Sequence, residues 1–217
     1  MQAIEVSVNY DFICPWCWIG RHNLGSGLRE AGLPVPVSIR YMPFELNPTM
    51  PIEGMDRREY RTAKFGSWAR SQGMDAQVAA AGLAAGAPFR YDLVKRTPNT
   101  RLAHQLMQYA QGGGDTQKTG ALYQAIFAAY FSEGRDIGAL DTLVEIATQT
   151  GFDANVVRMY LAQGQGVAAV IEAERLAQLQ GIRSVPTVFV AGEAISGAQP
   201  PAVFAHALRA ALERNAA

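Results

Sequence analysis

The stretch Cys14-Pro15-Trp16-Cys17 holds the only 2 cysteines of this 217-residue chain, and it lies between a strand-like run and a helix-like run. The preceding run, Ile4–Tyr10, alternates apolar and polar residues and is rich in β-branched side chains, which indicates a strand. Pro15 suits the first position of a helix, because its missing N–H needs no partner there and its φ is already helical. The stretch therefore predicts a strand–turn–helix unit with two thiols at the start of the helix.

Two cysteines spaced in this way at a helix start favour reversible exchange between a dithiol and a disulfide. Cys14 then occupies the N-cap, where the backbone N–H groups of Trp16 and Cys17 can point at its sulfur and stabilise a thiolate. Asp11 opposes this effect, because a nearby carboxylate disfavours a thiolate. We expect Cys14 to be the exposed nucleophile and Cys17 the more buried thiol that resolves the mixed disulfide.

Other interpretations of the pair stay open at this point. A structural disulfide is one, although closing so short a loop removes little chain entropy. Two inert buried thiols are another. A structural zinc site needs four ligands. The histidines that could join the cysteines are scattered along the chain without paired spacing: His22, His104 and His206.

The composition excludes several classes of partner. Lys plus Arg is 19 and Asp plus Glu is 19, so the formal net charge is zero. This gives no electrostatic reason to expect nucleic acid or an anionic membrane as a partner. Hydrophobic residues make up 49%, enough for a full core, but the apolar runs are too short to span a bilayer. No metal or nucleotide cofactor is implied.

The N-terminus opens Met-Gln-Ala-Ile-Glu, without the basic, apolar and small-residue regions of a secretory signal. We therefore expect a cytoplasmic protein. In a reducing cytosol the two thiols rest mainly as a dithiol, which favours reductase or isomerase work over net oxidation.

The rest of the chain indicates a β-α-β unit, a helical segment and a β-β-α unit. The first helix runs to about Ala31, and Val35–Tyr41 forms a second strand, parallel to the first because the return is short. The Pro-rich stretch 43–51 is expected to be a loop. Helices are expected over 56–72, 75–85, 99–111, 115–133, 140–150, 153–163 and 167–180. A hairpin of 186–190 and 194–196 follows, and Pro200 or Pro201 opens a last helix to about Arg214.

At this point the chain resembles the thioredoxin superfamily and, within it, the DsbA family. The resemblance covers nearly the whole length and includes Ser184-Val185-Pro186-Thr187 ahead of the third strand. More narrowly, 11–17 (DFICPWC) and 195–200 (ISGAQP) look like the cytosolic FrnE-like branch. The implied fold is α/β: a thioredoxin-like domain, 1–50 and 181–217, with a helical subdomain, 51–180, inserted between the second and third strands.

The resemblance implies that Cys14 is the nucleophile, that Cys17 resolves, and that Val185–Pro186 is a cis peptide beside the sulfurs. Such a turn can present the backbone of Val185 to an extended substrate, which pairs with it as an added strand. Strongly oxidising members are similar but carry a His between the cysteines. Trp16 stands there in this chain, which puts strong oxidant behaviour in doubt.

Several further candidate residues follow from the residue types or from the resemblance. Trp16, Phe12 and Trp18 are expected to form an apolar rim for substrates, with core packing of Trp18 as the alternative. His104 is expected on a helix that borders the substrate cleft in related glutathione-dependent isomerases. The buried acid usual in the superfamily has no clear counterpart, since Glu5 can face solvent. The run Asp56-Arg57-Arg58-Glu59 is expected to be a solvated helix face.

The sequence thus predicts a thiol-disulfide oxidoreductase that acts on protein or small-molecule disulfides, with glutathione as a possible partner. Two alternatives remain. One is a glutathione-dependent isomerase or transferase resembling 2-hydroxychromene-2-carboxylate isomerase, although those enzymes usually have Ser at the nucleophile position and lack the second cysteine. The other is a chaperone-like binding module without turnover.

Overall fold

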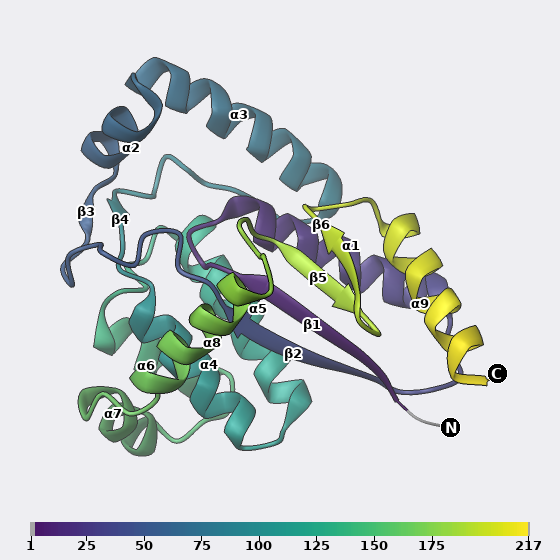
Figure 1. The fold of residues 1–217 in the computed structure, drawn as a ribbon. Helices are drawn as coiled ribbons and strands as arrows, with labels where there is room; N and C mark the ends of the chain where they lie inside the picture. Colours follow the sequence, from purple (N-terminus) through teal and green to yellow (C-terminus); the bar gives the residue numbers. More distant parts are fainter. Residues whose placement is uncertain (1–2, 217) are drawn as a thin grey trace.

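The central sheet has the strand order β2–β1–β5–β6 in a computed structural model that describes residues 3–216 (Figure 1). The strands are β1 (Ile4–Tyr10), β2 (Val37–Pro43), β5 (Thr187–Val190) and β6 (Glu193–Ser196). β1 pairs in parallel with β2 and antiparallel with β5, and β6 continues the sheet antiparallel to β5. The chain therefore has the thioredoxin-like arrangement that its sequence predicts.

The two faces of β1 are covered by different helices. Ile4, Val6 and Val8 are buried on one face, as their alternation predicts. On that side α1 (Pro15–Ala31) and α9 (Pro201–Ala216) pack against each other (Figure 1). Helix α8 (Val167–Leu179) lies over the opposite face.

The α1–α9 contact depends on one glycine. A Cβ added at Gly27 would lie 2.7 Å from Phe204 Cβ and 2.7 Å from the Pro201 carbonyl oxygen. Only a residue without a side chain allows the two helices to approach this closely. This packing fixes the direction of α1, and with it the position of the cysteines at its start.

Within the described residues, seven helices lie between β2 and β5, in the segment predicted to be helical. They are α2 (Arg57–Phe65), α3 (Trp68–Ala85), α4 (Arg101–Gly112), α5 (Thr116–Phe131), α6 (Leu140–Gln149), α7 (Ala154–Ala162) and α8. A short ribbon that the sequence analysis missed, β3 (Met55–Asp56) with β4 (Arg96–Thr97), precedes α2 and α4.

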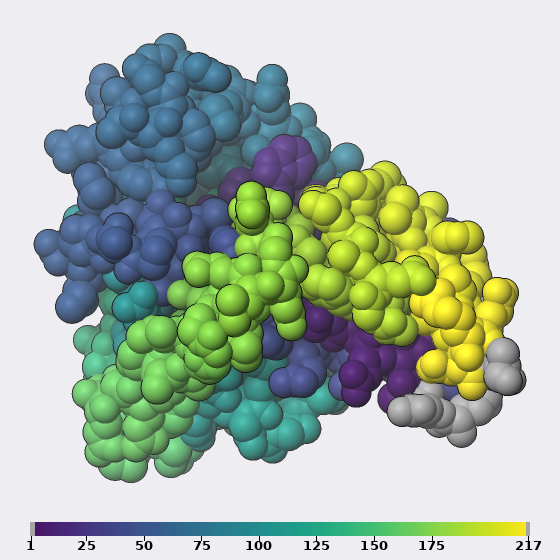
Figure 2. Space-filling view, in the orientation of Figure 1, coloured from purple at the N-terminus to yellow at the C-terminus, as the bar shows by residue number. Residues whose placement is uncertain are grey.

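The prediction of a single helix over 56–72 is wrong, because one helix ends within this range and a second one begins. Gly66 ends α2 with a positive φ of 89°, a conformation that favours glycine. Ser67 then caps α3, its side chain accepting a hydrogen bond from the Arg70 N–H. The two helices form an arm over the start of α1 (Figure 1), and the surface is hollowed between this arm and the body (Figure 2).

Among the described residues, no helix combines the length and the apolar character needed to cross a bilayer.

Candidate active site

The two cysteines lie at the N-terminus of α1, as the sequence predicts. Cys14 is the N-cap residue, with extended backbone at φ −88° and ψ 109°, and Pro15 opens the helix. Cys17 is fully buried. Burial is the main reason why the pKa of the Cys17 thiol is raised. The neighbouring Cys14 sulfur and the Asp11 carboxylate raise it further. Cys17 is therefore the more protected of the two thiols.

Two details of Cys14 differ from expectation. Its exposed fraction is only 5%, so the prediction of an exposed residue is wrong. Cys14 lines a cavity, and its sulfur is directed at the Val185 carbonyl oxygen. The Cys17 N–H donates to the Cys14 carbonyl oxygen at 3.0 Å rather than to the sulfur, because the first turn of the helix closes tightly.

The loop before β5 lies against the cysteines. The Val185–Pro186 peptide is cis, as the family resemblance implies. The Cys14 thiol donates to the Val185 carbonyl oxygen, with 3.5 Å between the two atoms. A Cβ at Gly20 would lie 3.2 Å from Pro186 Cγ, so the absence of a side chain in α1 lets this loop approach.

The three aromatic residues proposed for a substrate rim have different positions. Trp16 is 44% exposed and lines the cavity. Phe12 is fully buried, packed against Tyr10 with ring centroids 5.0 Å apart, so its assignment to the rim is wrong. Trp18 is also a core residue, with its ring 4.9 Å from that of Phe89. The side chains face inward because the β1–α1 turn lies over the helical insert.

His104 is fully buried and does not line the cavity, so the expectation that it borders a substrate cleft is wrong. Its Nε2 lies 3.3 Å from Oδ1 of Asp11, which is also fully buried. The other Asp11 oxygen accepts a hydrogen bond from the Leu46 N–H at 2.7 Å. Asp11 is thus a buried acid near Cys17, whereas Glu5 is exposed.

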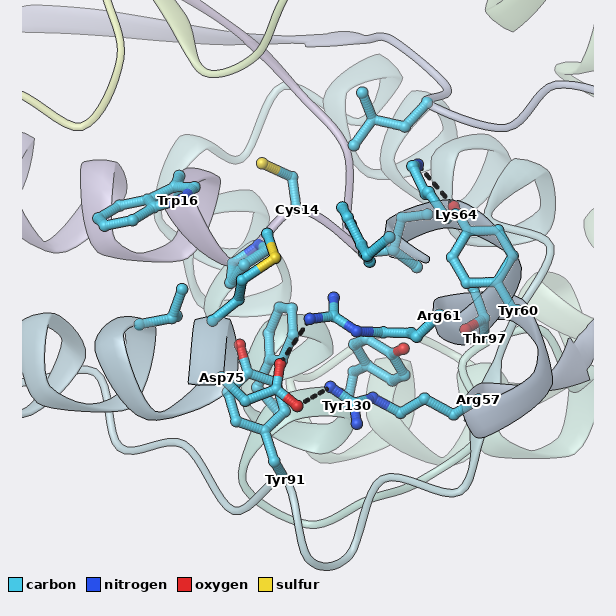
Figure 3. Close-up of a pocket in the computed structure, with 17 residues that line it drawn as sticks. Cys14, Trp16, Arg57, Tyr60, Arg61, Lys64, Asp75, Tyr91, Thr97 and Tyr130 are labelled. Atoms are coloured by element: carbon cyan, nitrogen blue, oxygen red, sulfur yellow. Dashed lines mark hydrogen bonds and ion pairs between the residues drawn. The ribbon is translucent and has the colours of Figure 1, made fainter. Parts of the chain in front are cut away.

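A cavity of about 260 Å³ opens between the start of α1 and the α2–α3 arm (Figure 3). Its apolar lining includes Ile13, Leu46, Phe65, Met74, Val78 and Phe131. The volume lies just below the range of about 300–1,000 Å³ that is usual for ligand pockets, so the cavity suits a small ligand.

The charged wall of this cavity was missed by the sequence analysis. Arg57, expected on a solvated face, has a side chain only 4% exposed, and it pairs with Asp75 at 2.7 Å. Arg61 pairs with the other Asp75 oxygen at 2.8 Å, and Lys64 lines the same cavity (Figure 3). The spacing of the three basic residues, i, i+4 and i+7, places them on one helix face and was the available signal.

Across residues 3–216, no group of three or more His, Cys, Asp or Glu side chains is arranged to hold a metal ion. The arrangement combines two neighbouring buried thiols with a small cavity beside Cys14. These are the parts that thiol–disulfide exchange requires.

Comparisons with known proteins agree with this chemistry. The crystal structure of the probable DsbA oxidoreductase SCO1869 from Streptomyces coelicolor matches with a TM-score of 0.86 and 29% identity, over 97% of this chain and 90% of that one. A 2-hydroxychromene-2-carboxylate isomerase matches with a TM-score of 0.74 and 17% identity, over 98% of each chain.

The cytosolic disulfide reductase DsbM from Pseudomonas aeruginosa matches with a TM-score of 0.66 and 17% identity, over 97% of this chain and 99% of that one. A second DsbM structure, with GSH, has a TM-score of 0.63. At these identities the isomerase and DsbM share the fold of this chain. The family model described as a DSBA-like thioredoxin domain matches residues 5–209. The chain therefore belongs to the DSBA-like thioredoxin domain family, whose members are thiol-disulfide oxidoreductases or isomerases.

Proposed function

We propose that this enzyme reduces or isomerises disulfides through Cys14 and Cys17, with Cys14 as nucleophile and Cys17 as resolving thiol. The observation that carries the proposal is the difference between the two sulfurs. Cys14 lies on the wall of a cavity and against the Val185–Pro186 loop, while Cys17 is fully enclosed in the first turn of α1.

The reaction needs only these two sulfurs. The Cys14 thiolate attacks one sulfur of a substrate disulfide, the substrate S–S bond breaks, and the released thiolate takes a proton from solvent. Cys17 then loses its proton and attacks the Cys14 sulfur, which releases the second substrate thiol. The enzyme dithiol is oxidised to a disulfide by two electrons, and the substrate disulfide is reduced to two thiols.

Protein and small-molecule disulfides use different parts of the site. An extended polypeptide can pair with the backbone of Val185 beside Pro186 and contact the exposed ring of Trp16. A small disulfide can enter the cavity. The DsbM structure with GSH supports glutathione as a partner of this fold.

The direction of the redox reaction and the cellular location of the enzyme are each supported by a separate observation. Trp16 stands where strongly oxidising relatives have a His, which favours reductase or isomerase work. DsbM, which shares the fold, is a cytosolic disulfide reductase. We therefore assign this enzyme to the cytoplasm and to the FrnE-like branch. We divide it into a thioredoxin-like domain, 1–50 with 181–217, and an inserted helical subdomain, 51–180.

A second candidate function is that of a glutathione-dependent isomerase or transferase, favoured by the similarity to 2-hydroxychromene-2-carboxylate isomerase over 98% of each chain. The presence of Cys17 favours the redox function, because isomerisation of a bound adduct needs no resolving thiol. A chaperone-like module without turnover is the third candidate.

The test is to incubate the reduced enzyme with glutathione buffers of known ratio and measure the fraction of Cys14–Cys17 disulfide. A reductase or isomerase equilibrates reversibly and reduces insulin and hydroxyethyl disulfide when thiols are supplied, and alkylation of Cys14 abolishes both activities. Aggregation suppression that survives alkylation, without disulfide turnover, favours the chaperone-like module. Turnover of a chromene carboxylate that survives Cys17→Ser favours the isomerase.

A further inference from the structure

The cavity beside Cys14 carries an excess of positive charge. Among the described residues that line it, the ionised side chains are three cations and one acid: Arg57, Arg61, Lys64 and Asp75. At neutral pH these sum to two positive charges. The neighbouring Tyr91 stays neutral, because burial raises its pKa well above the ordinary value.

Asp75 cannot offset both arginines. One of its oxygens accepts from Arg57 Nη2 at 2.7 Å, and the other accepts from Arg61 Nη2 at 2.8 Å. Arg61 Nε also donates to the Ser71 hydroxyl at 2.6 Å, so the guanidinium is held in place. One carboxylate shared by two fixed guanidinium groups leaves a net positive charge on this wall.

This charge is weakly screened by water. The side chains of Arg57, Arg61 and Asp75 are 4%, 16% and 10% exposed. Charge pairs in such surroundings interact more strongly than those at the surface. The pKa of the Arg61 guanidinium is lowered, mainly because burial disfavours its charged form. An anion that enters the cavity would relieve this unbalanced charge.

Lys64 extends the positive wall toward solvent. It lies on α2 one turn beyond Arg61, and its ammonium donates to the Tyr60 hydroxyl at 2.6 Å. Lys64 is exposed, while Arg61 is half-buried. Figure 3 shows Cys14 on one side of the cavity, with the side chains of Arg61 and Asp75 on the facing side. The cavity therefore has Cys14 on one wall and positive charge on the facing wall.

We propose that this cavity binds small disulfides that carry a carboxylate, with their sulfurs at Cys14 and the carboxylate at Arg61 and Lys64. The proposal rests on the proposed redox function and specifies its small-molecule substrates. A cavity of about 260 Å³ admits such a molecule but excludes a folded protein. Its apolar lining contacts the carbon chain between the sulfur and the carboxylate.

The chemical step is the exchange already described. The Cys14 thiolate forms a bond to the nearer substrate sulfur, and the substrate S–S bond breaks. The departing carboxylate-bearing thiolate takes a proton from solvent. Cys17 then displaces the second thiolate, so that two electrons pass from the enzyme dithiol to the substrate disulfide.

The test compares disulfides with similar carbon chains and different charge: dithiodipropionate, hydroxyethyl disulfide and cystamine. Each is mixed with reduced enzyme in a single turnover at low salt, and each rate is divided by its rate with free dithiothreitol. This division corrects for differences between the three disulfides in their intrinsic reactivity toward thiols. We expect the normalised rate to be highest for the anionic disulfide, lower for the neutral one and lowest for the cationic one. The preference for the anionic disulfide should fall as salt is added.

Variants of α2 locate the effect. Arg61→Gln and Lys64→Gln should each lower the normalised rate for dithiodipropionate by about three- to tenfold and leave that for hydroxyethyl disulfide within about twofold. Arg58→Gln is the matched control, because Arg58 is exposed on the same helix, does not line the cavity, and changes the net charge equally. Lys64 is exposed, so its variant should fold even if Arg61→Gln unfolds.

Equal normalised rates for the three disulfides, or an equal loss in Arg58→Gln, would overturn the proposal. Failure of the redox function is a separate outcome, since the neutral disulfide then also remains unreduced. In that case, calorimetry measures the binding of thiodipropionate, which has the two carboxylates but no S–S bond to reduce. Binding weakened by Lys64→Gln and not by Arg58→Gln supports the anion site, and absence of binding to the wild type refutes it.

Discussion

The Cys14 sulfur lies 3.5 Å from the carbonyl oxygen of Val185, a residue 171 positions further along the chain. This contact joins the start of α1 to the loop before β5 across the whole helical insert. It places the Cys14 sulfur beside the backbone with which, as we propose, an extended substrate pairs. In the proposed mechanism this sulfur attacks before that of Cys17.

Cys17→Ser should trap substrates as covalent mixed disulfides, and Cys14→Ser should not. Cys14 attacks first, and in the absence of Cys17 only an external thiol can release the adduct. The measurement is an acid quench of cells expressing each variant, followed by non-reducing gels. DTT-sensitive adducts mainly on Cys14→Ser would reverse the assignment of roles.

Phe12→Ala should reduce the free energy of unfolding by about 3–5 kcal/mol, because Phe12 is fully enclosed among aromatic rings. Trp16→Ala should reduce it by less than Phe12→Ala does, since Trp16 is 44% exposed and loses less buried apolar area. Urea titration of both variants measures the difference. Similar losses in the two would contradict the division between core and rim.

Gly27→Ala should reduce the free energy of unfolding by about 1–3 kcal/mol, because its new methyl group would meet Phe204 Cβ and the Pro201 carbonyl oxygen, each at 2.7 Å. Gly25→Ala on the same helix is the control. Its Cβ would meet only the flexible ends of Arg21, at 3.0 Å, and Arg29, at 3.8 Å. Alanine also has the higher helix propensity, so the control should be neutral or slightly stabilising. Thermal unfolding distinguishes the two, and a neutral Gly27→Ala would show that α9 can shift away.

Glu174→Gln should stabilise the protein progressively, relative to wild type, as the pH rises from about 4.3 to about 7. Burial and then the charge of Glu45 raise the pKa of Glu174 to about 7, against about 4.3 for an unfolded Glu. The folded wild type therefore binds the proton more tightly, and its stability falls through this window. Glutamine does not titrate, yet its carbonyl oxygen can still accept the hydrogen bond that the Glu45 N–H donates at 2.7 Å.

Urea titrations at several pH values measure this effect, in buffers of constant ionic strength. Glu172→Gln is the control, because Glu172 is exposed on the same helix and its hydrogen bond with Arg175 lowers its pKa. That variant should show no gain as the pH rises. A pH-independent difference between Glu174→Gln and wild type would show that folding does not raise the pKa of Glu174.

The elements and the cysteine pair could be predicted from the sequence, because their signals are local. Alternation over Ile4–Tyr10, Pro15 at the helix start and Gly151 at a helix stop each act within a few residues. The predicted helices over 140–150, 153–163 and 167–180 agree with α6, α7 and α8 within one or two residues at each end. Local steric and hydrogen-bonding preferences decide such boundaries.

Which face of each helix or turn is buried could not be predicted, because burial depends on the elements that pack against it. Arg57 and Asp75 are 18 positions apart and become partners only when α2 and α3 fold over the start of α1. Phe12 and His104 enter the core because the insert covers the β1–α1 turn. The sequence by itself determined the two thiols, their spacing and the order of strands and helices. Tertiary packing alone decided which side chains surround Cys14, since contacts between residues distant in sequence form only when the loops between them close.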